Sequence, residues 1–316
     1  MLFEKADNHC HFGGSITPEI IWQIMEFKNI KTTRTIHQLR KEMIISPQEI
    51  GLGFQRFLKK FNVLNQIQWD KDSIRFCTKK VCENYIKNDI KYINVSLSLN
   101  KYCNGMTPNE AAEVILDVFE SNSNVIMINP LLAIPYNSDK DFQIFIMKSI
   151  MEDKNLFERF KGIDLVGDES YFDCELYKNN LKKWRNKCIR AHVGEIKGTS
   201  KNVYEAIEIL GVDRIAHGIF ADDESIIKAS EKGIWFDLAI NSNMYIGSVK
   251  DITKHPIKNI LNKGCRVTLS TDDPIQFSCD VEDEYKLAIN KDLISEADSL
   301  LLSNIAIESV KRINLL

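Results

Sequence analysis

The sequence predicts an α/β fold, a (β/α)8 TIM barrel with extra helices over the C-terminal face. Short runs rich in Val, Ile and Leu alternate with longer stretches of helical period, which is typical of βα units and a parallel sheet. Such runs occur eight times in order, and the 316 residues exceed the roughly 250 that this barrel typically needs. No low-complexity segment or linker divides the chain, so we expect one domain over residues 1–316.

The apolar runs give the expected strands, at 5–12, 90–99, 125–134, 162–168, 188–195, 213–219, 233–240 and 265–273. Helix signals lie between them. Thr17-Pro18 and Thr107-Pro108 each place a capping hydroxyl before a proline in the first helical turn, and Glu110 completes a capping-box spacing with Thr107. The helix that contains NVYEAIEIL is expected to end at Gly211 in a left-handed cap.

The stretch from 35 to 89 is too long for a single crossover helix, so we expect it to supply extra helices over one barrel end. Within it, four apolar residues share a helical face at spacings of 3, 4 and 7: Phe54, Phe57, Leu58 and Phe61. Two interpretations are open for this face. It packs into the core, or it forms an apolar lid over a flat substrate.

Composition excludes several classes of protein. The chain is 44% hydrophobic and 27% charged, with a net charge of −3, whereas a groove for long nucleic acid usually shows a basic excess. No apolar run approaches the roughly 18 residues of a membrane span, and the N-terminus lacks the apolar stretch of a signal peptide. The eight cysteines include no Cys-x-x-Cys pair, so we expect reduced thiols and a cytoplasmic location, with no membrane or long nucleic-acid partner.

Polar residues of unusual type gather where the predicted strands end, which is where a barrel of this kind carries its chemistry. They are His9 and His11 in the first run, His192 and Glu195 in the fifth, His217 in the sixth, and Asp272 and Asp273 in the eighth. The remaining two histidines, His37 and His255, have no such placement, and we interpret them as solvated or structural.

The His9-x-His11 spacing is compatible with a metal site. Residues two apart on a strand share a face and lie about 6.5 Å apart, so two imidazoles could hold one ion, although they could also be ordinary strand residues. Three imidazoles and a carboxylate form a plausible ligand set for Zn²⁺ or a similar ion that leaves a position for water. Such an ion lowers the pKa of water from ~16 towards ~7.

Together these motifs resemble those of the adenosine deaminase family, within the amidohydrolase-type metal-dependent barrels. HCHFGGSITPE resembles the family's His-x-His-Leu-Asp-Gly-Ser opening, and FQRFLKKF resembles its substrate-covering helix. DLVGDE, HVGE, RIAHG, NSN, HPI and LSTDDP follow in the family's order, so the resemblance runs through nearly the whole chain.

The resemblance implies a role for each matched residue. One Zn²⁺ per chain would be bound by His9, His11, His192 and Asp272. Glu195 would give a proton to N1 of the adenine ring as hydroxide attacks C6, and His217 would orient the water. Asp273 would hydrogen-bond N7, and the backbone of Gly167 would meet N3. The reaction would replace the 6-amino group of an adenine nucleoside or 5′-mononucleotide by a 6-oxo group and release ammonia.

The sequence departs from the family at Gly13. Family members that act on free adenosine carry an acidic residue there, which contacts the 5′ end of the ribose. Gly13 removes that carboxylate, and Gly13 with Gly14 leaves backbone N–H groups free to approach an anion. This favours AMP, dAMP or an N6-substituted relative slightly over adenosine and deoxyadenosine, which remain the alternative. Asn94-Val95-Ser96 replaces a frequent Glu-x-Arg and indicates a divergent branch.

Three other functions compete with this interpretation. A barrel of the same type could hydrolyse an amide, an ester or another cyclic amidine, or it could be a catalytically silent nucleotide-binding relative. A nucleic-acid deaminase is disfavoured because the chain lacks both a basic face and the His-x-Glu with Pro-Cys-x-x-Cys signature. The sequence leaves oligomeric partners open.

Overall fold

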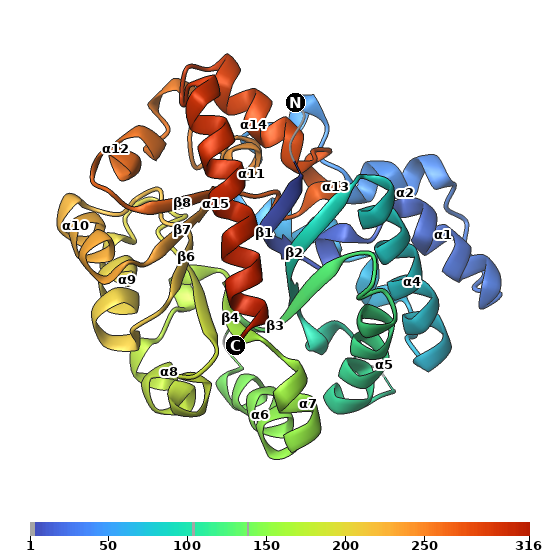
Figure 1. The fold of residues 1–316 in the computed structure, drawn as a ribbon. Helices are drawn as coiled ribbons and strands as arrows, with labels where there is room; N and C mark the ends of the chain where they lie inside the picture. The colour runs from blue at the N-terminus through green and yellow to red at the C-terminus, as the bar shows by residue number, and fades with distance from the viewer. Residues whose placement is uncertain (1–3, 103–104, 138) are drawn as a thin grey trace.

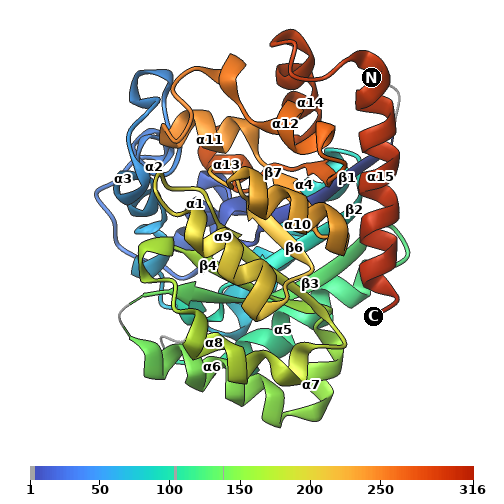
Figure 2. The same ribbon diagram turned by 90° about the vertical axis from the view of Figure 1, so that its left-hand side faces the viewer.

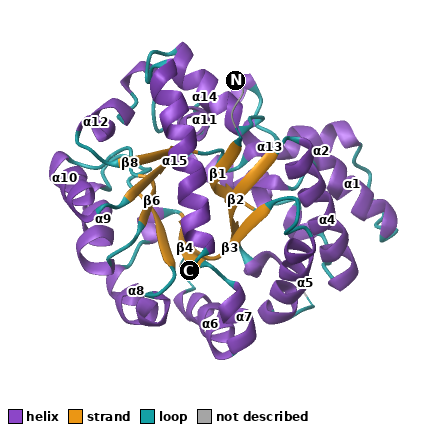
Figure 3. Cartoon of the chain, in the orientation of Figure 1, coloured by secondary structure: helices purple, strands orange, loops and turns teal. Residues whose placement is uncertain are grey.

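Eight parallel strands form a nearly closed barrel surrounded by helices (Figure 3), as the sequence predicts. The computed structural model describes residues 4–102, 105–137 and 139–316. The strands are β1 (Lys5–His11), β2 (Ile90–Leu97), β3 (Met127–Tyr136), β4 (Gly162–Gly167), β5 (Cys188–Val193), β6 (Arg214–His217), β7 (Trp235–Leu238) and β8 (Arg266–Leu269). Each strand pairs with the next along the chain.

The barrel closes where β1 meets the segment that follows β8. The backbone N–H of His11 donates to the carbonyl of Asp272, and the N–H of Asp272 donates to the carbonyl of His9, each over 2.8 Å. These two bonds make the isolated parallel bridge between Cys10 and Asp272. The closing contact therefore runs through the residues that the sequence predicts as metal ligands.

The helices occupy the predicted positions between the strands. They are α1 (Pro18–Phe27), α2 (Ile36–Met43), α3 (Phe54–Leu58), α4 (Lys71–Lys87), α5 (Pro108–Ser121), α6 (Lys140–Glu152), α7 (Lys154–Arg159), α8 (Cys174–Asn180), α9 (Ser200–Glu205), α10 (Asp223–Lys232), α11 (Ile240–Ile246), α12 (Ile257–Asn262), α13 (Pro274–Phe277), α14 (Val281–Asn290) and α15 (Glu296–Asn314). The side chain of Thr17 caps α1, and Thr107 with Glu110 forms a capping box at α5. Both predicted caps are confirmed.

The strand limits differ from the predicted ones by up to four residues, most of all at the end of the last strand. β8 ends at Leu269 rather than 273, because the chain turns out of the ladder and Asp272 adopts φ 63°, in the left-handed region. The helix that ends at Gly211 has α geometry only to Glu205, and its last turn is π-helical. Gly211 itself has φ 59°, as expected of a left-handed cap.

The stretch from 35 to 89 forms α2, α3 and α4 with short 3-10 turns between them, which confirms the expected extra helices. α4 packs beside β2 and α5 in the outer layer, whereas α2 and α3 lie at the barrel end opposite α15 (Figure 2). This is the end to which the strands point their carboxyl termini.

The long C-terminal helix α15 crosses the N-terminal mouth of the barrel (Figures 1 and 2). Its residues Ala306, Ile307 and Val310 pack against Ala6 of β1. The carbonyls of Ala306 and Val310 accept hydrogen bonds from the side-chain amides of Asn8 and Asn129. The helix thus seals that mouth with both apolar and polar contacts.

Two further expectations concern membrane helices and cysteines. Within the described ranges, no helix combines the length and the apolar character that crossing a bilayer requires. The seven described cysteines are all unpaired. Cys103 lies outside the described residues.

Candidate active site

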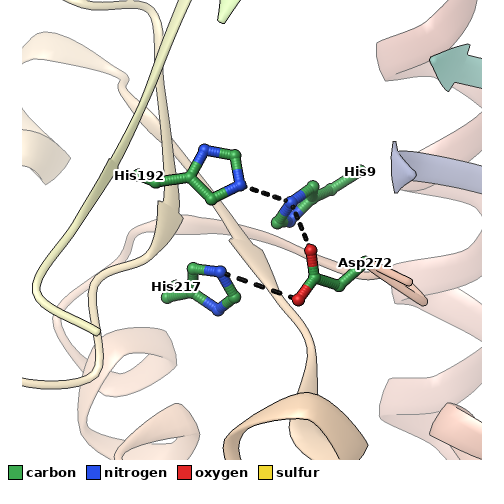
Figure 4. Close-up of side chains that lie close together, drawn as sticks. All are labelled: His9, His192, His217 and Asp272. Carbon is green, nitrogen blue, oxygen red and sulfur yellow. Dashed lines mark hydrogen bonds and ion pairs between the residues drawn. The ribbon is translucent and has the colours of Figure 1, made fainter. Parts of the chain in front are cut away.

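Histidine and aspartate side chains converge at the carboxyl ends of the strands, and Figure 4 shows four of them: His9, His192, His217 and Asp272. The Nε2 atoms of His9 and His11 are 3.2 Å apart, because the two residues share one face of β1. Nε2 of His192, from β5, is 2.9 Å from that of His9 and 3.1 Å from that of His11. Oδ1 of Asp272 is 3.1 Å from both β1 nitrogens.

These spacings fit a single divalent cation. Zinc bonds to histidine and carboxylate are about 2.0–2.2 Å long, so tetrahedral donor atoms stand about 3.4 Å apart, close to the separations measured here. Three imidazole nitrogens and a carboxylate oxygen are also a donor set that suits zinc. The four predicted ligands are therefore brought together, and His217 joins the edge of the same cluster.

Further partners orient the donor side chains. Nδ1 of His192 lies 3.2 Å from Oδ1 of Asp164 and 3.1 Å from the carbonyl of Leu165. Ser242 donates from its hydroxyl to Oδ2 of Asp272 over 2.8 Å. Such partners fix the tautomer and orientation of metal-binding side chains. The sequence reasoning assigned no role to Asp164 or Ser242, although a charged residue inside a buried strand was a usable signal for Asp164.

His217 lies slightly apart from the four converging donors. Its Nε2 is 3.7 Å from Oε1 of Glu195 and 3.9 Å from Oδ2 of Asp272. Both separations exceed a direct hydrogen bond and suit one bridging oxygen atom. His217 has φ 66°, so it shares with Asp272 a backbone conformation that non-glycine residues seldom adopt, and such residues concentrate at functional sites.

Glu195 is held as a buried acid beside this cluster. The carboxylate of Glu169 accepts the backbone N–H groups of Gly194, Glu195 and Ile196 at 2.6–2.7 Å, which fixes the loop after β5. Burial, together with the nearby charges of Asp272 and Glu169, raises the pKa of Glu195 well above its ordinary value. Its side chain can therefore carry a proton near neutral pH. Glu169 was also missed as a supporting residue.

The two neighbouring aspartates have opposite environments, as expected for adjacent residues that point apart. Burial opposes ionisation of Asp272, but the interactions with His9 and His11 outweigh it and hold its pKa well below normal. Burial and the charge of Asp272 raise the pKa of Asp273 well above normal. Among the described residues, Oδ1 of Asp273 has no hydrogen-bond partner, although its residue stands at the N-cap of α13.

A cavity of about 370 Å³ opens onto these groups. It is within the size range of small-molecule sites. Its lining includes His11, Gly13, Phe54, Phe57, Leu58, Phe61, Lys101, Gly167, His192, Glu195, His217, Asp272 and Asp273. The four apolar residues of the FQRFLKKF face fit both open interpretations, because they line the cavity and also pack together, with Phe57 stacked on Phe277. Lys101 is a lining residue that the sequence reasoning missed.

The three candidate glycines are placed differently. Gly13 lines the cavity, and a Cβ there would meet Leu64 at an ordinary 3.6 Å. Gly167 also lines it, with φ 96°. Gly14 is not among the cavity-lining residues, and a Cβ there would stand only 2.0 Å from Oδ1 of Asp273. Gly14 thus permits the close approach of Asp273.

The two histidines outside the predicted site also differ. His37 is exposed on α2, which agrees with a solvated residue. His255 is buried, so it is structural rather than solvated. Its Nε2 lies 3.2 Å from Oδ1 of Asn243.

A parallel eight-stranded barrel with a His/Asp donor cluster at its strand ends defines an amidohydrolase-type architecture. Comparison with known proteins narrows this class. The chain matches the adenosine deaminase family over residues 4–313. It is 28% identical over 300 residues to the adenosine deaminase of Clostridium kluyveri, covering 91% of this chain and 84% of that protein. This protein belongs to the adenosine deaminase family, whose members are hydrolytic deaminases acting on C–N bonds of cyclic amidines.

Solved structures share the fold. The N6-methyl-AMP deaminase of Arabidopsis thaliana superimposes with a TM-score of 0.80 at 20% identity, covering 98% of this chain and 95% of that one. The adenine deaminase of Arthrobacter aurescens also gives a TM-score of 0.80, at 18% identity, over 98% of this chain and 99% of that one.

Proposed function

We propose that this chain, as one domain over residues 1–316, is a zinc-dependent deaminase of 6-aminopurine 5′-mononucleotides. AMP or dAMP is favoured slightly over adenosine or deoxyadenosine. The observation that carries the proposal is a cluster of three imidazoles and a carboxylate that fits one ion, beside a buried Glu195 whose pKa is raised. An acid poised next to a nucleophile site is the arrangement that hydrolytic deamination requires.

Four residues would hold the ion: His9, His11, His192 and Asp272. Zinc, when bound, would lower the pKa of water and so make a hydroxide nucleophile accessible near neutral pH. His217 would orient the attacking water from the edge of the cluster, where its Nε2 faces both Glu195 and Asp272.

The remaining site residues would bind and protonate the purine. Glu195 would deliver its proton to N1 as C6 is attacked. Asp273, whose raised pKa favours the protonated form, would donate a hydrogen bond to N7, and its unpartnered Oδ1 supports a contact with substrate. The backbone of Gly167 would meet N3. The apolar face of Phe54, Phe57, Leu58 and Phe61 would cover the base.

Two features of the cavity support a 5′-phosphate. Gly13 lines the wall and leaves free the volume that a carboxylate side chain would fill, with Gly14 next in the chain. Lys101 lines the same cavity, so its ammonium group is available to a phosphate bound there. The name of the Arabidopsis relative also specifies a 5′-mononucleotide substrate with an N6 substituent.

Steady-state kinetics of purified protein of known metal content tests the substrate proposal. Adenosine, deoxyadenosine, AMP and dAMP are compared by ammonia release and by the absorbance change from adenine to hypoxanthine. We expect higher kcat/KM for the nucleotides. Gly13→Asp should lower kcat/KM for AMP about tenfold through charge repulsion and spare adenosine. A tenfold preference of the wild-type protein for unphosphorylated substrates would overturn the nucleotide assignment.

Metal removal tests the zinc proposal separately. Dialysis against a chelator should abolish turnover, and one equivalent of Zn²⁺ per chain should restore it. Turnover that persists in metal-free protein would contradict the proposal. Metal-dependent hydrolysis of amides or esters with no activity on aminopurines would instead favour the alternative hydrolase.

A further inference from the structure

A chain of three buried side chains runs from the backbone of α12 to the edge of the candidate site. Nδ1 of His255 lies 3.3 Å from the backbone nitrogen of Ile257. Nε2 of His255 lies 3.2 Å from Oδ1 of Asn243, and Nδ2 of Asn243 lies 3.2 Å from Nδ1 of His217. The three side chains are almost completely buried.

The direction of every hydrogen bond in this chain follows from its first member. A backbone N–H can only donate, so Nδ1 of His255 must accept from Ile257. Burial lowers the pKa of His255 to about 4, so its ring is neutral near pH 7 and carries its one proton on Nε2. That proton is donated to Oδ1 of Asn243, which orients the amide so that Nδ2 faces His217.

An amide nitrogen is a donor only, so Nδ1 of His217 must accept. A neutral His217 ring then carries its proton on Nε2, the atom that faces Glu195 and Asp272. We infer that Asn243 and His255 are positioning residues that lock His217 in the Nε2–H tautomer. Locked in this way, His217 presents a hydrogen-bond donor to an oxygen atom held between those two carboxyl groups. It cannot accept the proton of the attacking water with that nitrogen.

The inference deepens the role proposed for His217 and rests on the proposed function only for its kinetic consequence. A donor at Nε2 stabilises negative charge on the oxygen it faces, and this contribution is lost if the tautomer changes. The hydrogen-bond chain supplies this donor from a neutral His217 ring.

The test combines tautomer measurement with kinetics on zinc-loaded, full-length protein. Nitrogen NMR of ring-labelled histidine reports directly which nitrogen of His217 bears the proton, and it needs no turnover. We expect Nε2–H in the wild-type protein. In Asn243→Asp, a carboxylate accepts from both rings, so the proton of His217 should move to Nδ1. With AMP, kcat should fall at least tenfold, while KM and bound metal stay unchanged.

Paired variants of His255 give a second, milder perturbation. His255→Gln keeps a donor for Asn243, whereas His255→Leu removes it and frees the amide to rotate. We expect a single Nε2–H signal and near wild-type kcat in the first, and mixed tautomers with reduced kcat in the second. Asn129→Asp is the matched control, because it buries a new carboxylate at the other end of the barrel. It should leave the tautomer of His217 unchanged.

Two results would overturn the inference. One is an Nδ1–H tautomer of His217 in the wild-type protein. The other is a His217 tautomer that is unchanged in both Asn243→Asp and His255→Leu. If none of the four purine compounds is turned over but the tautomers behave as described, the proposed function fails and the positioning chain stands.

Discussion

The two ends of the barrel both bury charged side chains, but they treat them in opposite ways. Towards α15, Arg214 is paired with Asp237, with Nε 2.8 Å from Oδ2, and it also donates to the hydroxyl of Ser309 on α15 over 2.6 Å. At the opposite end, burial and neighbouring carboxylates raise the pKa values of Glu195 and Asp273, and the opposing interaction of Asp273 with His11 does not cancel the shift. Charge is neutralised in pairs where the fold is sealed, and groups of like charge are crowded together where the chemistry is proposed.

The difference shows how stability and activity are divided along one barrel. Removing one partner of a buried ion pair lowers the free energy of unfolding by several kcal/mol. Burying an acid among like charges instead shifts its pKa, and catalysis can use the shifted value. Substitutions at the α15 end should therefore change stability with little effect on turnover. Replacing a crowded acid at the other end should lower turnover with little loss of stability.

The largest expected effect is that of Glu195→Gln at the site end. The amide keeps the shape but cannot deliver a proton, so kcat with AMP should fall on the order of 10²- to 10⁴-fold. The free energy of unfolding should not decrease, because a crowded buried acid is replaced by a neutral group. Stopped-assay kinetics and urea unfolding measure the two quantities, with the exposed Glu175→Gln as control. A loss of less than tenfold would contradict the role of Glu195.

Arg214→Met tests the opposite end. It leaves the buried carboxylate of Asp237 without its bidentate partner, which should cost about 3–5 kcal/mol of unfolding free energy. Because Arg214 is remote from the cavity, kcat of the folded fraction should stay within twofold of wild type. Adding Asp237→Leu should recover part of the lost stability. A large drop in kcat at unchanged stability would break the division between the two ends.

Gly14→Ala sharpens the comparison within the site end. Its new Cβ would overlap Oδ1 of Asp273, so we expect a loss of about 1–3 kcal/mol in stability together with a lower kcat/KM. The neighbouring Gly13→Ala meets only ordinary contacts and should change stability by no more than about 0.5 kcal/mol. Equal effects of the two substitutions would refute the close approach of Gly14 to Asp273.

The smallest effect is a pH dependence from His255. Its folded pKa of about 4 lies below the ordinary 6.5, so between these values the unfolded chain binds a proton that the folded chain does not. Stability from this residue is therefore complete above pH 6.5 and falls as pH drops. The loss is about 1.4 kcal/mol at pH 5.5. Urea unfolding at pH 7.5 and 5.5 should show that His255→Gln loses less stability on acidification than the wild-type protein does. An identical loss in the two proteins would disprove this contribution of His255.

The order of the strands and the placement of histidines and aspartates at the strand ends were predictable because each depends on local sequence. Every apolar run that predicts a strand forms one, and the histidines and aspartates stand at strand ends where a barrel gathers its chemistry. Strand limits were harder to predict, since β8 stops where Asp272 turns into the left-handed region. No pattern of residue types in the sequence predicts that turn.

The supporting residues could not be predicted, because their structural roles depend on partners that are distant in the sequence. Glu169 binds backbone groups 25 to 27 residues away, and Asp164 binds a histidine 28 residues away. Lys101 reaches the cavity only because the turn after β2 folds towards it. His255 illustrates the same limit, since nothing near it in sequence links it to His217.

The two hydrogen bonds that join β1 to the segment after β8 have a consequence for biosynthesis. The donor atoms of His9 and His11 leave the ribosome first, but they cannot meet the carboxylate of Asp272 until that residue has emerged and the ends of the barrel have joined. Completion of the fold and assembly of the proposed ion site would thus be one event. A nascent or truncated chain that lacks the last strand would carry the imidazoles without the geometry that binds an ion. An ion bound by residues of both segments would stabilise the contact between β1 and the segment after β8.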